Sequence, residues 1–194
     1  MRWLFIAAGF ALSPAAPAAD SIYISPDGAF QFRFSRSLAW CHEVAGDRNR
    51  WEPSSLCMSH EPMCHEHAIA CLAYPGNEYK GYNFVAAALS ISRITALNEG
   101  EDDLARYCHS PEPRIEHGVK FVTRKCVEGA LGSYYYTELY RTCHGGACYE
   151  LDLTIATTEY SNYHPGAVKE FKAGEWKNVT GRLKRMVDTL QFLK

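Results

Sequence analysis

The sequence predicts an α+β domain in which an antiparallel sheet of hairpins and meanders carries helices on one face and disulfide bonds add stability. Three observations support this fold class. Apolar and polar residues alternate in several segments between residues 21 and 157, as they do in half-buried strands. A long amphipathic helical pattern at residues 176–190 closes the chain. The chain also contains eight cysteines, an even number that suits a disulfide framework.

Length and composition exclude several classes of protein. The chain has 194 residues, of which 47% are hydrophobic and 22% charged, and this excludes a disordered chain and a coiled coil. The formal net charge is −2. Because binding to nucleic acid needs a basic face, we expect no nucleic acid as a partner.

Residues 1–19 have the layout of a secretory signal peptide. A positively charged residue precedes the apolar run Trp3–Leu12, and small residues follow it. These ten apolar residues are too few to span a bilayer, which needs about 20. We therefore expect cleavage near Ala18 or Ala19 and a soluble, secreted or periplasmic protein. Residues 20–194 are then a single domain without a transmembrane segment, and a retained N-terminal anchor is the alternative.

The first predicted elements form a hairpin. Residues 21–24 and 29–35 are joined by Pro26-Asp27-Gly28, in which proline presets φ, aspartate caps the turn and glycine takes a left-handed position. In the second strand, phenylalanines at every second position from Phe30 to Phe34 fall on one face. We expect that face to be buried.

A Cys/His-rich insertion is expected at about residues 41–71, because residues 41–67 are polar and show no clean period. We expect this polar part to be a loop pinned by its cysteines. It leads into a strand at residues 68–74 and a long strand at residues 83–94. The residues expected on one face of the long strand are Val85, Ala87, Leu89 and Ile91.

A short helix and a meander follow. The acidic run 101–103 marks a first helical turn, because negative side chains are favourable at that end of a helix. Leu104, Tyr107 and Cys108 then share one face of the helix, which ends before Pro111. The meander begins with the alternating residues 119–124.

The next hairpin comprises residues 133–143 and 148–157, joined by the loop 144–147, and this loop sets a register. Cys143 then lies opposite Cys148, which allows a bridge between them. The other predicted pairs are Arg141 with Glu150, Thr137 with Thr154, Tyr140 with Leu151, Thr142 with Tyr149, and Tyr136 with Ile155. Opposite charges and Thr–Thr pairs are favourable across strands, whereas Glu138 opposite Leu153 disagrees with the pattern.

The chain ends in an amphipathic helix followed by a short strand. One side of the helix is apolar and the other carries lysine and arginine. The apolar residues are Trp176, Val179, Leu183, Met186, Val187 and Leu190. Residues 189–193 alternate in the manner of a strand.

These features together resemble the PsbP/Mog1-like α+β sandwich. The resemblance rests on the Pro-Asp-Gly turn before Phe30-x-Phe32-x-Phe34, on the tyrosine-rich meander, and on the long helix that runs into Leu190-Gln191-Phe192. Within that group, the chain resembles small exported bacterial proteins whose activity is unassigned. The resemblance implies an accessory, binding or assembly role and supplies no active-site motif. The Cys/His-rich residues 57–71 depart from the shared pattern.

All eight cysteines follow the predicted signal peptide and are candidates for disulfide bonds in an oxidising compartment. They are Cys41, Cys57, Cys64, Cys71, Cys108, Cys126, Cys143 and Cys148. Eight cysteines allow on the order of 100 pairings, so the spacing leaves the connectivity open. Each bond would add about 2–4 kcal/mol. Cys143 and Cys148 flank a hairpin loop and not a helix N-terminus, which favours a structural bridge over a redox pair.

The segment from Cys57 to His67 contains the strongest candidate for a metal site, because imidazole and sulfur ligands suit zinc or copper. The candidate ligands are His60, Met63, His65 and His67. The spacing fits no zinc knuckle, and the alternative is a solvated loop whose cysteines form disulfides. We expect no cofactor, with zinc or copper as the alternative.

The tyrosines of the C-terminal half either pack in the core or line a binding surface. They are Tyr134, Tyr135, Tyr136, Tyr140, Tyr149, Tyr160 and Tyr163. The hairpin register favours core positions for Tyr136, Tyr140 and Tyr149.

The function expected from these observations is that of an exported, non-enzymatic domain that binds an unidentified protein or a cell-envelope component. Two alternatives stay open. One is a secreted or periplasmic zinc or copper protein that uses the Cys57–His67 segment. The other is a hydrolase whose site the sequence does not reveal.

Overall fold

The computed structural model describes residues 20–44, 47–52, 64, 68–97, 101–130 and 132–193. The predicted signal peptide therefore lies outside the described residues. The described strands form two antiparallel sheets, a small one in the order β1-β2-β11 and a large one in the order β4-β3-β5-β6-β10-β9-β8-β7. The small sheet contains β1 (Asp20–Ile24), β2 (Phe30–Ser35) and β11 (Gln191–Phe192).

The large sheet supplies most of the secondary structure. Its strands are β3 (Ala39–Val44), β4 (Asp47–Glu52), β5 (Ala70–Ala73), β6 (Phe84–Ile94), β7 (Glu112–Glu116), β8 (Val119–Ala130), β9 (Ser133–His144) and β10 (Ala147–Thr158). The α-helices are α2 (Glu101–Tyr107) and α3 (Ala173–Asp188), and the short 3-10 helices are η1 (Gly76–Tyr79) and η2 (Tyr160–Asn162). No helix among the described residues has the length and apolar character needed to cross a membrane.

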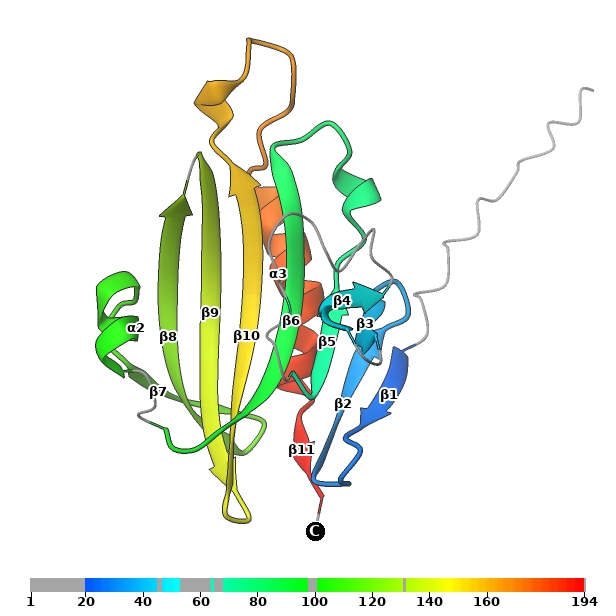
Figure 1. Ribbon diagram of the computed structural model, residues 1–194, viewed down its shortest axis with the longest axis vertical. Helices are drawn as coiled ribbons and strands as arrows, with labels where there is room; N and C mark the ends of the chain where they lie inside the picture. Colours follow the sequence, from blue (N-terminus) through cyan, green and yellow to red (C-terminus); the bar gives the residue numbers. More distant parts are fainter. Residues whose placement is uncertain are drawn as a thin grey trace, which may run out of the picture.

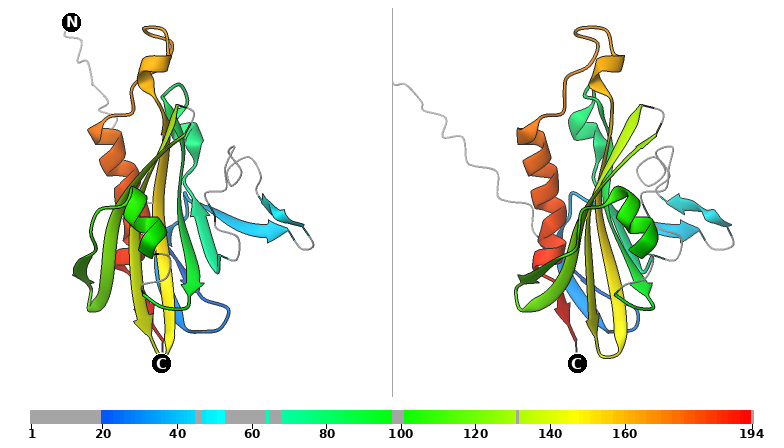
Figure 2. Two further views of the ribbon diagram at one scale, coloured as in Figure 1. Left: turned by 60° about the vertical axis from the view of Figure 1, so that its left-hand side comes forward. Right: turned by 90° about the vertical axis from the view of Figure 1, so that its left-hand side faces the viewer.

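The elements are arranged in layers (Figures 1 and 2). Helix α3 and the small sheet cover one face of the large sheet, which we call the helix face. Helix α2 lies against the opposite face, which we call the far face, because Cys108 directly after α2 is bonded to Cys126 of β8. The prediction of an antiparallel sheet with packed helices is confirmed, but the expectation that both helices share one face is wrong.

The first hairpin folds as predicted. Strands β1 and β2 pair with each other, and Gly28 has a φ of 68° in the turn between them. The Asp27 carboxylate accepts hydrogen bonds from the Ser25 hydroxyl at 2.7 Å and the Ala29 amide at 3.1 Å. Phe30 and Phe32 are buried at the boundary between the small sheet and the large one.

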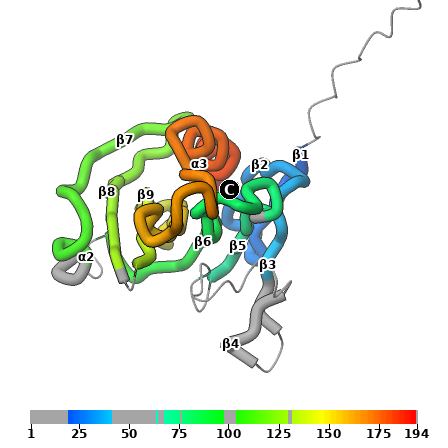
Figure 3. The backbone as a smooth tube through the Cα atoms, turned by 90° about the horizontal axis from the view of Figure 1, so that it is seen from above, coloured from blue at the N-terminus to red at the C-terminus, as the bar shows by residue number. Residues whose placement is uncertain are grey.

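Helix α3 packs its apolar stripe on the helix face. Val179, Leu183, Met186 and Val187 are buried there, as the amphipathic pattern predicts. They belong to the same core cluster as Leu89 and other apolar side chains of β6 and β10. Burying one such side chain contributes about 1.5–3 kcal/mol. The large sheet curls around α3 when it is seen from above (Figure 3).

The β9–β10 hairpin has the predicted register throughout. Cys143 is paired and bonded with Cys148, and the remaining predicted pairs, Glu138 with Leu153 included, are all present. The connection is shorter than the predicted loop, because His144 and Ala147 also pair and only two glycines form the turn. Gly145 and Gly146 have φ values of 59° and 80°, which is the geometry that tight hairpin turns require.

Three other expectations need correction. Strands β3 and β4 lie within the expected loop, and β3 pairs with β5. Strand β7 was not expected, because it contains Pro113; this residue is tolerated there because β7 is an edge strand. Helix α2 ends at Tyr107, so Cys108, which was expected on the helix, lies directly after it.

Strand β6 begins and ends as expected but contains one irregularity. The register with β10 shifts between Ala156 and Thr157, so that Ala86 pairs with Ala156 and Phe84 with Thr157. Val85 is the extra residue, and it packs with the cluster on the far face. Its predicted place beside Leu89 is therefore wrong, and a β-bulge is the reason.

The far face holds a buried ion pair. Nε and one terminal nitrogen of Arg141 each lie 2.6 Å from Glu150, and the other terminal nitrogen donates to the Leu97 carbonyl at 3.0 Å. Only 5% of the Arg141 side chain and 15% of the Glu150 side chain are exposed. The pair therefore ties the segment after β6 to the middle of the sheet.

We expect Arg141→Met to lower the free energy of unfolding by about 3–5 kcal/mol, because it leaves the Glu150 carboxylate buried without its guanidinium. Urea denaturation measures this loss, and Arg141→Met/Glu150→Leu should recover much of it. The control is Arg93→Met, since Arg93 lies 3.6 Å from Asp27 and its side chain is 60% exposed. That change should cost less than about 1 kcal/mol. Equal losses in both single variants would contradict the prediction.

A second prediction concerns the ion pair between α3 and the sheet edge. Lys184 donates to Glu116 of β7 at 3.2 Å, and Arg114 is also paired with Glu116. Burial raises the pKa of Glu116, but Lys184 and Arg114 outweigh it and hold the pKa below its usual value. The contribution of Glu116 to stability is thus present above its ordinary pKa and is lost as the pH falls through the lowered one.

We therefore expect Glu116→Gln to destabilise the protein at pH 7 by about 0.5–1 kcal/mol. The difference from the wild type should vanish in acid below the lowered pKa. Urea denaturation series at several pH values measure both quantities. Glu112→Gln, an exposed position on the same strand, is the control. A difference that is constant with pH would contradict the role given to Glu116.

Candidate functional site

The residues of the predicted metal site lie outside the described part of the chain. This holds for His60, Met63, His65 and His67, and also for Cys57. Zinc or copper binding by these residues therefore stays a prediction. The histidines that the structure describes come from separate segments, and His144 stacks on Phe192 with ring centroids 4.5 Å apart.

Three buried cysteines come together at the edge of the far face. The sulfur atoms of Cys41, Cys64 and Cys71 all lie within 4.8 Å of one another. Cys64 is bonded to Cys71, and Cys41 also belongs to a disulfide. Zinc binds thiolates, so these sulfurs are not available as ligands in this oxidised form. The sequence could not indicate that Cys41 joins them, because that depends on the pairing of β3 with β5.

The tyrosines divide between the core and the surface. Tyr140 and Tyr149 are buried as predicted, and Tyr135 packs on the far face. Tyr136 is 36% exposed, so its predicted core position is wrong. Its ring contacts Trp176 of α3 in an edge-to-face arrangement, with ring centroids 4.9 Å apart.

A pocket of about 330 Å³ is lined by residues of β7, β8 and β9 and by the segment before β7. The Tyr140 hydroxyl at its wall donates to Glu138 at 2.6 Å. Burial raises the pKa of Tyr140 well above its usual value, and the bond to Glu138 raises it further. Glu138 lies opposite the apolar Leu153, as the register predicts, but its carboxylate accepts a hydrogen bond from Tyr140. This hydrogen bond explains how a charged residue is tolerated on the apolar side of the hairpin.

A groove of about 810 Å³ runs along the outer side of α3, and we call it the α3 groove. One wall is the helix itself, with Gly174, Lys177, Asn178, Gly181, Arg182 and Arg185. The other wall comes from distant segments, with Asp20 at the start of β1, Ser35 and Ser37 at the end of β2, and Glu78 in η1.

Ion pairs join the two walls of the groove. Arg182 lies 2.8 Å from Glu78, and Arg185 lies 2.5 Å from Asp20. Glu78 also accepts a hydrogen bond from the Tyr74 hydroxyl at 2.7 Å. Burial raises the pKa of Tyr74, and this hydrogen bond raises it further, so Tyr74 stays a donor to Glu78. These contacts hold the charged groups of the groove in fixed positions.

Lys177 lines the same wall before the two arginines, and no described acidic side chain forms a salt bridge with it. The two glycines of this wall leave the helix backbone uncovered: a methyl group added at Gly174 or Gly181 would meet no atom within 4 Å. Sequence analysis identified the polar side of this helix but no site on it. The spacing of Gly174, Lys177 and Gly181 along one helix face was the available signal.

Comparison with known proteins concerns the fold alone. No family model matches the sequence, and no curated protein matches it. A solved structure from Bacteroides thetaiotaomicron is 12% identical to this chain, with a TM-score of 0.47. The match covers 89% of this chain and 48% of that chain, so this chain spans about half the length of that protein.

Two further matches are to proteins of the group that the sequence resembles. The cyanobacterial PsbP of Synechocystis sp. PCC 6803 is 12% identical, with a TM-score of 0.48 and coverage of 94% of this chain and 98% of that chain. The Ran-binding protein Mog1p of Saccharomyces cerevisiae is 8% identical, with a TM-score of 0.45 and coverage of 90% and 95%. At these identities and TM-scores, no activity or partner of PsbP or Mog1p is carried over to this chain.

Proposed function

We propose that this chain is an exported, disulfide-stabilised binding domain without catalytic activity, and that its α3 groove holds an acidic, extended segment of a partner protein. The observation that carries the proposal is the α3 groove itself, with its size, its cations and its uncovered helix backbone. The disulfides described above support the exported location, since such bonds persist in oxidising compartments.

The charge of the groove favours an acidic partner. Residues 169–194 contain seven lysines and arginines but three aspartates and glutamates, although the whole chain has a net charge of −2. In the groove itself, Lys177, Arg182 and Arg185 outnumber Asp20 and Glu78, so its lining has a net charge of +1. Complementary charge steers association and selects partners more than it adds affinity, so an acidic segment is the favoured occupant.

The glycines of the groove favour an extended occupant. A glycine inside a helix costs about 0.5–1 kcal/mol relative to alanine. Within the described chain nothing packs against Gly174 or Gly181, so their size serves no internal contact. An uncovered helix backbone lets a second chain approach closely. The two glycines then lower the stability of the helix but allow binding, and functional sites often reduce stability in this way.

A binding experiment tests the groove. Fluorescence anisotropy with a labelled glutamate-rich peptide should show saturable binding that weakens as salt is added. Lys177→Ala/Arg185→Ala should reduce the affinity by about tenfold, which is about 1.4 kcal/mol. The control is Lys120→Ala/Lys125→Ala, which removes two exposed lysines on β8. Equal binding by both double variants, or no binding by the wild type, would contradict the proposal. Binding to anionic lipid vesicles instead of the peptide would also contradict it.

Substitution of the glycines separates binding from stability. We expect Gly174→Ala/Gly181→Ala to raise the free energy of unfolding by about 1–2 kcal/mol, because both positions accept a methyl group without contact. The same variant should bind the peptide more weakly than the wild type. Thermal denaturation and anisotropy measure the two effects. A variant that is more stable and binds equally well would show that the uncovered backbone plays no part.

Metal binding by the Cys57–His67 segment remains the alternative function. It predicts zinc or copper in protein purified without a histidine tag, and elemental analysis measures this. If the binding domain proposed here is the correct function, we expect less than about a tenth of an equivalent of either metal, and no tight binding on titration.

A further inference from the structure

Two of the three disulfides that the structure describes in full follow one pattern. Cys108 with Cys126 and Cys143 with Cys148 are pairs of opposite residues on neighbouring antiparallel segments. Their Cα atoms are 3.9 and 4.0 Å apart, and each pair is bonded. Cys41 and Cys71 are opposite residues on β3 and β5 in the same way.

Cys41 and Cys71 are nevertheless not bonded to each other. Cys71 is bonded to Cys64, seven residues earlier in the chain, with Cα atoms 5.8 Å apart. Cys41 is held in a separate disulfide. The sulfur of Cys41 still lies within 4.8 Å of the sulfurs of Cys64 and Cys71. Each sulfur of the Cys64–Cys71 bond therefore has a third sulfur beside it.

We propose that Cys41 can replace Cys64 as the bonding partner of Cys71, so that this corner of the sheet exists in two disulfide isomers. In the isomer described here, Cys71 is tied to Cys64 of the segment between β4 and β5. In the second isomer, a cross-strand bond joins Cys41 to Cys71, as the other two cross-strand pairs are joined. Cys64 then takes over the former partner of Cys41.

The exchange needs a small thiol as catalyst and no net oxidant or reductant. Its thiolate attacks the disulfide of Cys41, forms a mixed disulfide with the cysteine bonded to Cys41, and releases Cys41 as a thiolate. The Cys41 thiolate attacks Sγ of Cys71, the Cys41–Cys71 bond forms, and Cys64 leaves as a thiolate. The Cys64 thiolate then attacks the protein sulfur of the mixed disulfide and releases the small thiol. Two disulfide bonds are present before the exchange and two are present after it.

The three sulfurs of the cluster are buried close to an edge of the large sheet. Cys41, Cys64 and Cys71 are 2%, 0% and 0% exposed, so the exchange among these three sulfurs takes place away from bulk solvent. Strand β3 is next to the edge strand β4 and projects beside the main body of the large sheet (Figures 1 and 2). Edge elements open at a lower free-energy cost than the centre of a sheet.

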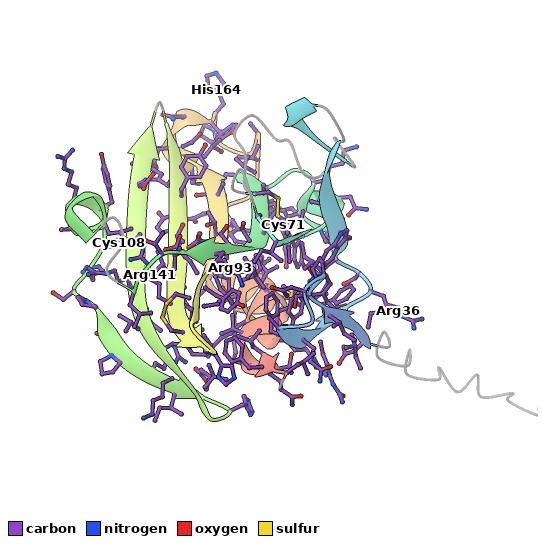
Figure 4. The ribbon with its side chains drawn as sticks, turned by 60° about the horizontal axis from the view of Figure 1, so that its bottom comes forward. Arg36, Cys71, Arg93, Cys108, Arg141 and His164 are labelled. Carbon is purple, nitrogen blue, oxygen red and sulfur yellow. A yellow bond between two sulfur atoms is a disulfide. The ribbon has the colours of Figure 1, made fainter. Side chains whose placement is uncertain are left out.

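The other described disulfides have no such neighbour. Among the described residues, Cys41, Cys64 and Cys71 are the only cysteines whose sulfurs gather in a group of three. Figure 4 shows Cys108 beside α2, well separated from Cys71. The Cys108–Cys126 bond is therefore an internal control within the same molecule.

Peptide mapping distinguishes the two isomers. The full chain is incubated with catalytic reduced glutathione, blocked with N-ethylmaleimide in acid, and digested without reduction by trypsin and glutamyl endopeptidase. These proteases separate residues 37–43, which contain Cys41, from residues 67–78, which contain Cys71, and leave Cys64 on a third fragment. We expect a species in which fragments 37–43 and 67–78 are joined directly, at the expense of 67–78 joined to the fragment with Cys64. The Cys108–Cys126 pair should stay unchanged.

Two variants test the exchange even if the second disulfide isomer is too rare to detect in the wild type. In Cys64→Ser, we expect Cys71 to enter a bond with Cys41 after incubation with glutathione. In the control Cys108→Ser, the released Cys126 should stay a free thiol that N-ethylmaleimide labels. The proposal is overturned if wild-type protein never yields the 37–43/67–78 species and Cys71 of Cys64→Ser remains fully labelled. It is also overturned if Cys126 exchanges as readily as Cys71.

Discussion

The contact between the apolar stripe of α3 and the helix face of the large sheet organises the rest of the protein. Val179, Leu183 and Met186 are fully enclosed by side chains from β6, β10 and the small sheet. Because this contact fixes the rotation of α3 about its axis, the opposite side of the helix must face solvent. The cations and glycines of the α3 groove stand there as a direct consequence.

The two faces of the large sheet are stabilised in different ways. The helix face is closed by apolar burial, which is the larger and less directional contribution. The far face is covered by the short helix α2 and by connecting segments, so it relies on Arg141 with Glu150 and on disulfides that fix the covering segments. Disulfides thus occur where apolar packing is thin, and that is also where sulfurs are close enough to exchange.

The elements that could be predicted from the sequence are those that local pattern determines. The register of β9 with β10 follows from a tight turn and a strict alternation, and a shift of one residue would turn every side chain to the wrong face. The Pro-Asp-Gly turn and the stripe of α3 are local in the same sense. Strands β3, β4 and β7 were missed because their residues lack alternation, so it is the neighbouring strand that holds them extended. Val85 was misplaced because a β-bulge decides its surroundings, and Tyr136 was misplaced because its 36% exposure is set by tertiary packing that the alternation does not encode.

The sequence by itself determined the fold class, the main hairpins, the amphipathic helix and the register that places Cys143 opposite Cys148, because each depends on residues close together in the chain. Only the tertiary structure decided the α3 groove and the cluster of Cys41, Cys64 and Cys71. Residues about 165 positions apart meet across the groove when Arg185 pairs with Asp20. The sulfur cluster exists because β3 lies against β5, a pairing between segments that no local spacing encodes. Contacts of this kind depend on how whole strands and helices pack together, so the local pattern of residues in the sequence does not predict them.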